Sequence, residues 1–230
     1  MLLTLVCAAA HAQGLHGALG ASTDDEFRGI SQSDGDPSAQ ADLHVTATHW
    51  YGGGSAEAVR GGASGSRGPE LIAYAGYLYA AAGNALSAAL TLRHYDYPTV
   101  DRRYDELAAS LSWRNVVRAT VTASPDTPPP LYRPYNPYSP YSRDGGAMAF
   151  SYEVVGQAPL PLGLHVQAGV GYYDLHRQIG YGYAYGSAGL GYQWRTWQLD
   201  VRYVATDNGI RRLYPLAAAP RLLASILWTF

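Results

Sequence analysis

The residues best suited to chemistry in this 230-residue chain are histidines and aspartates that follow apolar runs. His94, Asp96 and Asp101 follow one run, and Asp174 and His176 follow another. Such Asp/His groups beside a nucleophilic serine would suit hydrolysis. The seven histidines show no metal-ligand spacing, and neither a phosphate-binding glycine loop nor a nucleophile elbow is present. We therefore expect no metal, no cofactor and no enzyme activity, and a hydrolase is the less favoured alternative.

A second set of polar residues alternates with apolar ones. In residues 197–205, Leu199 and Val201 share one face, while Asp200 and Arg202 lie on the other. A slip of one residue would turn these charges into lipid, where an arginine at the midplane costs about 2 to 4 kcal/mol, so the register is well specified. The residues predicted to face inward and line a pore are Asp42, His44, Arg93, Glu106, Arg118, Glu153, His165, Gln198, Asp200 and Arg202. They would either set the selectivity of a narrow aqueous path or pair across the interior as a polar plug.

The segments that carry these residues are about ten residues long and alternate in the same way along the chain. We expect twelve strands, at 15–23, 39–49, 53–60, 70–82, 85–95, 104–113, 115–124, 146–157, 163–173, 184–194, 196–205 and 221–230. The links between them alternate strictly between short and long. The short links are 50–52, Gly83-Asn84, Arg114-Asn115, 158–162 and Arg195-Thr196; the long ones are 24–38, 61–69, 96–103, 125–145, 174–183 and 206–220. This pattern predicts an all-β fold: a closed, antiparallel, up-and-down transmembrane β-barrel of about twelve strands, with short periplasmic turns and long extracellular loops.

The aromatic residues favour the same fold. All five tryptophans, namely Trp50, Trp113, Trp194, Trp197 and Trp228, are predicted at the short-turn edge. Tyrosines at strand ends are predicted toward the opposite edge, among them Tyr95, Tyr104, Tyr172, Tyr183 and Tyr203. Two girdles of aromatic rings are typical of a protein that spans two membrane interfaces.

Other architectures remain as alternatives. A soluble, lipocalin-like barrel shares the period of two but does not need an apolar outer face on every strand. The uncharged stretch 71–92 is long enough for a membrane helix, although Gly83-Asn84 near its middle favours a hairpin turn. The net charge of -2 and the pI near 6.4 give no basic footprint for nucleic acid.

The two ends of the chain suggest export and assembly. Residues 1–12 resemble a signal peptide, with Ala10-His11-Ala12 before a predicted cut at Gln13, so the barrel domain is 13–230. The only cysteine, Cys7, lies in this segment, so a mature chain would contain no thiol. The last strand must pair with the first to leave no edge in lipid. Trp228 and Phe230 resemble the aromatic signal read by the barrel-assembly machinery.

One loop carries a family resemblance. Phe27, Arg28, Gly29, Ile30, Ser31 and Gln32, followed by Asp36-Pro37, resemble the signature of the TorF-type porin family of small Gram-negative outer-membrane proteins. Further matches are ELIAYAGY at 70–77, LRHYDYP at 92–98 and YDELAASLSW at 104–113, so the resemblance covers roughly residues 20–124. It implies a barrel in the outer membrane and a pore, without an established substrate.

Two loops could give such a pore its specificity. Arg28 of the motif is expected to point into the mouth and to pair with an acid such as Asp24 or Asp34. The Pro/Tyr-rich loop 125–145 would be extended, either as a stiff exposed loop or folded over the mouth. The sequence thus favours a passive channel for small polar solutes. A plugged structural or adhesive barrel is the alternative of a different class. The expected partners are outer-membrane lipid and lipopolysaccharide, the assembly machinery and small solutes, but not nucleic acid.

Overall fold

The computed structural model describes residues 14–61, 66–81, 85–127 and 147–230. The predicted signal peptide 1–12, the predicted turn at Gly83-Asn84 and residues 128–145 of the Pro/Tyr-rich loop lie outside these ranges.

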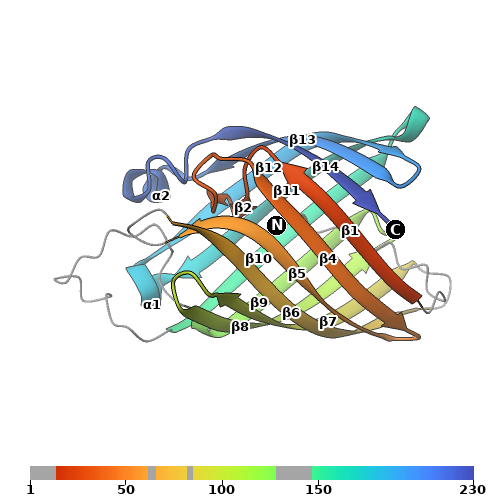
Figure 1. Ribbon diagram of the computed structural model, residues 1–230, viewed down its shortest axis with the longest axis horizontal. Helices are drawn as coiled ribbons and strands as arrows, with labels where there is room; N and C mark the ends of the chain where they lie inside the picture. The colour runs from red at the N-terminus through yellow and green to blue at the C-terminus, as the bar shows by residue number, and fades with distance from the viewer. Residues whose placement is uncertain (1–13, 62–65, 82–84, 128–146) are drawn as a thin grey trace.

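Twelve antiparallel strands close into a single barrel (Figure 1), which confirms the predicted fold. Each strand pairs with its neighbour along the chain, and the last barrel strand pairs with the first. The barrel strands are β1 (Gly14–Ser22), β4 (Ser38–Ala47), β5 (Trp50–Gly61), β6 (Ser66–Ala80), β7 (Leu86–Tyr97), β8 (Arg102–Trp113), β9 (Val117–Thr127), β10 (Ala147–Pro159), β11 (Leu164–Leu175), β12 (Tyr181–Trp194), β13 (Trp197–Thr206) and β14 (Arg221–Thr229). The remaining two strands, β2 (Glu26–Phe27) and β3 (Ile30–Ser31), form a separate hairpin within the predicted loop 24–38.

The closing seam joins β1 to β14. Ala18 lies opposite Thr229, and the pairing continues to Ser22 and Ser225. Gly17 and Phe230 extend it by exchanging two backbone hydrogen bonds of 2.9 and 3.0 Å. The ring of Phe230 lies over Gly17, where a Cβ would be 2.4 Å from it, so a larger residue at this position would displace the ring. Every barrel strand therefore has two neighbours, as lipid requires.

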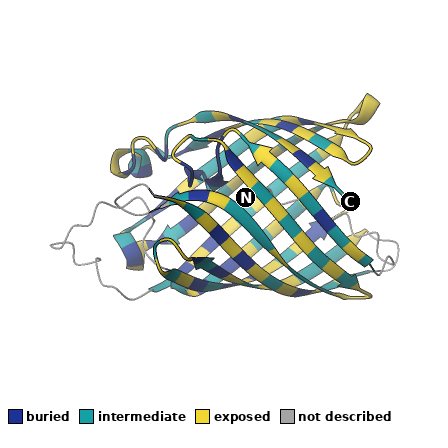
Figure 2. Ribbon diagram, viewed as in Figure 1, coloured by how far each residue is buried: buried dark blue, intermediate teal, exposed yellow. Residues whose placement is uncertain are grey.

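Exposed and less exposed residues alternate along the strands (Figure 2). On β13, Leu199 and Val201 are exposed on the outer wall, whereas Asp200 between them is 5% exposed. The same alternation holds on β11, where Val166 and Val170 are exposed and His165 and Gln167 are half-buried. The predicted strand register is therefore confirmed.

Residues in the short turns adopt left-handed backbone conformations, with positive φ. Arg114 and Asn115 both have positive φ, 51° and 55°, as the two central residues of a type I′ hairpin do. The turn between β4 and β5 is Thr48-His49, with Thr48 at φ 50°. The prediction that Trp50 lies in this turn was wrong, because its backbone already pairs with Ala47 as the first residue of β5.

All five tryptophans are exposed and lie at the short-turn edge, as predicted: Trp50, Trp113, Trp194 and Trp197 flank short turns, and Trp228 lies opposite Trp197. The tyrosine girdle was predicted wrongly in part. Tyr172 and Tyr203 are exposed on the outer wall, but Tyr95, Tyr104 and Tyr183 are at most 4% exposed. Their positions in the alternation place them on the inner face, since His94 and Asp105 beside them face outward.

Helices are few and short. A 3-10 turn covers Pro161–Gly163, and α1 (His176–Ile179) and α2 (Asn208–Leu213) lie in two of the long links. Across the described ranges, no helix is long and apolar enough to cross a membrane. The stretch 71–92 instead contributes to β6 and β7.

Candidate functional site: a hairpin inside the barrel

The β2–β3 hairpin turns through the predicted motif. Arg28 and Gly29 are its two central residues, with φ 52° and 85°, and Phe27 pairs with Ile30 across the turn. A Cβ on Gly29 would lie 2.7 Å from Thr206 and from Tyr185, so only glycine allows this approach to the barrel wall. The motif thus folds into the barrel interior and not outward as an exposed loop.

Arg28 anchors the tip of the hairpin to the opposite wall. Its guanidinium lies 2.9 and 3.1 Å from the two carboxylate oxygens of Glu106 on β8, a residue with no exposed surface. The rings of Phe27 and Tyr173 flank the guanidinium at 4.3 Å each, an arrangement that stabilises a cation. Burial opposes the charge, but Glu106 outweighs it and holds the pKa of Arg28 well above its ordinary value. The predicted pairing with Asp24 or Asp34 was wrong: these acids contact Arg221 and Arg60 instead.

Glu26 connects the hairpin to β13. Its carboxylate lies 3.2 Å from Arg202 and accepts a hydrogen bond from the Gly29 amide. Burial alone would raise its pKa, but the positive charge of Arg202 and this amide keep the pKa of Glu26 below its usual value. Glu26 is therefore held as an anion inside the barrel.

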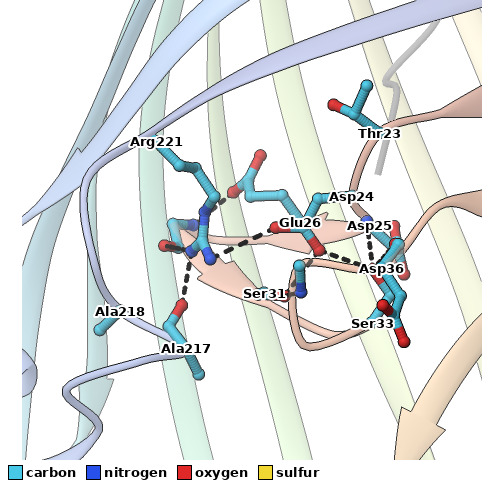
Figure 3. Close-up of polar contacts among 12 residues, drawn as sticks. Thr23, Asp24, Asp25, Glu26, Ser31, Ser33, Asp36, Ala217, Ala218 and Arg221 are labelled. Carbon is cyan, nitrogen blue, oxygen red and sulfur yellow. Dashed lines mark hydrogen bonds and ion pairs between the residues drawn. The ribbon is translucent and has the colours of Figure 1, made fainter.

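Arg221, the first residue of β14, joins the hairpin to a second loop (Figure 3). Its guanidinium lies 3.3 Å from Asp24 and donates to the backbone carbonyls of Gly29, at 2.8 Å, and Ala217. Asp24 also accepts hydrogen bonds of 2.6 Å from the hydroxyls of Ser31 and Ser33. One arginine thus connects the start of the hairpin, its turn and the segment 207–220.

The segment 207–220 covers the same end of the barrel. Asp207 caps α2 by accepting hydrogen bonds from Gly209 and Ile210, at 2.8 and 3.1 Å. Burial opposes ionisation of Asp207, but the amide of Ala184 and these capping amides keep its pKa below the usual value. The side chain of Ile210 is fully buried in a cluster with Ile30 and Tyr183. The hairpin and this segment together fill the long-loop end of the interior with a packed core.

The other half of the interior has polar groups that are paired but more open. Asp42 contacts His44 and accepts from the Tyr74 hydroxyl, at 2.6 Å each. Asp200 lies 3.3 Å from His165 and accepts hydrogen bonds from Gln198 and Gln167.

The remaining predicted lining residues are spread around the wall. Tyr185 donates to Glu153 at 3.0 Å, and Arg118 donates to Ser112 at 3.2 Å. Arg93 is half-buried and forms no ion pair with another described residue. The predicted lining residues therefore form several separate polar contacts around the lumen, and only Glu106 and Arg202 touch the hairpin.

The residues considered for hydrolysis do not converge. His94 contacts Asp105 at 2.8 Å, and His176 contacts Asp174 at 2.6 Å, at two exposed places. Asp96 and Asp101 instead lie near Arg103, at 3.5 and 3.9 Å. Within the described residues neither imidazole contacts a serine, and no group of three or more His, Cys, Asp or Glu residues could hold a metal ion.

A closed barrel with an apolar outer wall and a polar interior is the fold of outer-membrane β-barrel proteins. The chain belongs to the Gcw_chp family, described as bacterial protein of unknown function, whose model matches residues 8–230. No curated protein sequence matches it significantly. The family match does not test the resemblance to the TorF-type porins, which stays a prediction.

Solved structures share the fold at low identity. One, reported under "Unveiling the Mechanism Behind the in-meso Crystallization of Membrane Proteins", is 12% identical with a TM-score of 0.53 over 94% of this chain and 83% of its own. OmpF of Salmonella typhi, in complex with daunomycin, is 12% identical with a TM-score of 0.47 over 94% and 97%. The Pseudomonas putida toluene transporter TodX is 8% identical with a TM-score of 0.48 over 95% and 90%.

Proposed function

We propose that this protein is a porin-like channel of the Gram-negative outer membrane that passes small polar solutes by passive diffusion. The observation that carries the proposal is the β2–β3 hairpin, which enters a polar lumen and is held there by charged groups of the wall. An inserted segment that narrows a polar lumen would give a pore its size limit and its selectivity. In the proposed channel the long loops face the outside of the cell and the short turns face the periplasm. Residues 1–12 would be the signal peptide that directs export.

The partners follow from the same proposal. Lipid and lipopolysaccharide would contact the apolar wall and its aromatic edges, and the assembly machinery would recognise Trp228 and Phe230. No enzyme activity is proposed, because the Asp/His pairs at the long-loop end lie apart and are exposed.

Conductance of the refolded chain 13–230 in a planar bilayer tests the channel directly. We expect small, discrete steps. Replacing Arg93 and Arg118 with glutamine should shift the ion selectivity toward cations without releasing the hairpin, because the ion pairs that hold the hairpin are those with Glu106, Arg202 and Arg221. A folded, heat-modifiable barrel that never conducts with the hairpin in place would refute the proposal.

A plugged structural or adhesive barrel is the second candidate. It is favoured by the packed core at the long-loop end, where Ile210 and Ala218 have no exposed surface. The same recording separates the two functions. A plugged barrel conducts only when the hairpin is deleted, whereas a channel conducts with the hairpin in place.

A further inference from the structure

Three carboxyl groups meet where the hairpin faces β5 and β6. Glu57 and Glu70 lie directly opposite each other on these two strands. Asp25, just before β2, hydrogen-bonds Glu57 through its side chain. Like charges directly opposite in a sheet are destabilising, so this arrangement needs a compensating positive group or protons.

The other buried acids of the hairpin region already have such a group. Glu106 is paired with Arg28, Glu26 with Arg202, and Asp24 with Arg221. In each of these three pairs a guanidinium group compensates the buried carboxylate: it comes from the hairpin for Glu106 and from the wall for Glu26 and Asp24.

Glu70 differs from these acids. It is 2% exposed, and its Oε2 atom has no hydrogen-bond partner. The groups that act on it most strongly are the carboxyls of Glu57 and Asp25 and the hydroxyl of Tyr97. Gln40, the neighbour of Glu57 on β4, also has a side-chain amide nitrogen without a partner. A buried acceptor oxygen without a donor is costly unless a ligand supplies one.

The titration of Asp25 agrees with this geometry. Burial raises the pKa of Asp25 to about 7, and the negative charge of Glu57 and its hydrogen bond add to the rise. The ionisable groups that face it are Glu57 of β5, Glu70 of β6 and Glu26 of the hairpin, with Tyr97 of β7 beyond Glu70. A positively charged ligand would lower the pKa of Asp25 and stabilise the ionised carboxylates.

The geometry points to an ammonium ligand and not to a metal. We propose that Asp25, Glu57 and Glu70 form a binding site for the primary ammonium group of a cationic organic solute that enters the lumen. A metal needs its oxygen ligands to converge at about 2.0 to 2.6 Å, and no described group of acids does so. An ammonium group has three N–H donors that can reach separate carboxylates at hydrogen-bond distance.

The surroundings of the site are closed on one side and open on another. Tyr97 packs against Tyr104, which stacks on Tyr95, and these rings are at most 4% exposed, so they close the site on the side of β7 and β8. Glu57 is half-buried, so the site is not sealed. A small hollow lined by Asp25, Gln40 and Arg202, among other residues, reaches the Asp25 member of the site from the side of β1 and β14. This inference rests on the proposed channel function and names the class of solute the channel favours.

Binding can be measured without conduction. We would titrate the refolded chain 13–230 in detergent with 1,5-diaminopentane by calorimetry, at pH 8 and at pH 5.5, with 1,5-pentanediol as the neutral probe. We expect binding of the diamine and not of the diol. The affinity should fall at least tenfold at pH 5.5, because protonated carboxyl groups do not compensate the ligand charge.

Isosteric variants locate the site. Glu70→Gln and Glu57→Gln should each weaken binding at least tenfold and reduce its pH dependence. Asp200→Asn is the matched control, since Asp200 is a lumenal acid paired with His165 on the far side of the barrel, and it should bind as the parent does. Heat modifiability on a gel identifies the variants that fold. Gln40→Leu changes a neutral residue on the same wall and should weaken binding less than Glu70→Gln or Glu57→Gln does.

The outcomes separate this inference from the channel itself. No binding by the folded parent, equal loss in Asp200→Asn, or tighter binding of Ca²⁺ alone than of the diamine would overturn the ammonium site. A protein that conducts but does not bind the diamine refutes only this inference. A protein that binds the diamine but never conducts refutes only the channel.

Discussion

Replacing Arg28 with methionine should release the hairpin from the lumen. The change leaves the carboxylate of Glu106 buried with no exposed surface and without its guanidinium partner. Breaking one partner of a buried ion pair costs about 3 to 5 kcal/mol. The Tyr95 hydroxyl, at 3.2 Å, is the only other described donor to Glu106 and cannot neutralise it. Since Glu106 regains water when the hairpin leaves, the cost falls on docking of the hairpin and not on the barrel.

The population with the hairpin out should therefore rise by about 150-fold or more, because 1.36 kcal/mol is a factor of ten. Thiol labelling measures this. The chain contains one cysteine, Cys7, which is absent from the refolded chain 13–230. Ile30→Cys supplies a single thiol at a site that is 7% exposed when the hairpin is docked. Its labelling rate reports the open fraction when opening and closing are fast relative to the reaction.

A double-mutant cycle tests the cause. Arg28→Met with Glu106→Gln should label several-fold more slowly than Arg28→Met alone, because the neutral amide needs no counterion and still accepts from Tyr95. Arg93→Met is the control, since Arg93 faces the same lumen without an ion pair to a described residue, and its labelling should stay within threefold of the parent. If Arg28→Met labels no faster than this control, the ion pair does not hold the hairpin.

Three further predictions use the same variants and refolding conditions. Asp25 has a raised pKa in the folded chain, so it favours the docked hairpin below its ordinary pKa and loses this contribution as pH rises through about 7; labelling of Ile30→Cys, divided at each pH by the rate of the same cysteine in the urea-unfolded chain to remove the change in thiolate fraction, should therefore be slower at pH 5.5 than at pH 8, and Asp25→Asn should remove this normalised difference. Val201→Arg, near the middle of the lipid face of β13, should cost about 2 to 4 kcal/mol in urea unfolding from liposomes, whereas Gln198→Arg on the lumen face should cost far less; equal costs would refute the register. Asp207→Ala should lower the stability of the α2 segment by about 1 kcal/mol through loss of its cap, seen as faster amide exchange at Ile210 with the barrel strands unchanged.

The barrel could be predicted because each strand shows its inner and outer faces in its own sequence, through the alternation of polar and apolar residues. The cost of placing Asp200 or Arg202 in lipid determines the register of a strand of about ten residues. The same rule, applied strictly, also places Tyr95 and Tyr104 inside, next to the outward His94 and Asp105. The position of a tyrosine along its strand indicates how close it lies to the membrane interface, but the alternation of residues determines whether it faces lipid or the lumen.

The position of the hairpin could not be predicted in this way. The Arg28-Gly29 pair is a local turn signal, but the partners that determine where the turn goes are remote. Glu106 is 78 residues from Arg28, and Arg221 is 192 residues from the Gly29 carbonyl it binds. Nothing in the residues near Arg28 distinguishes Glu106 from Asp24 or Asp34 as its partner. The interior location of the motif is thus a property of the closed barrel, which brings β8, β13 and β14 around it.

The charges around the hairpin are distributed unequally, and this indicates on which side the passage of the proposed channel would lie. The compensated pairs hold the hairpin to β8, β13 and β14 through Arg28, Glu26 and Arg221. On the β5–β6 side its inner contact is with Glu57 and Glu70, and there like charges oppose docking. The ion pairs of Asp36 with Arg60 and Arg67 lie at the exposed rim, where water screens them. The hairpin should therefore separate first from β5 and β6, and solutes should pass along that wall, where the carboxyl groups would favour cations.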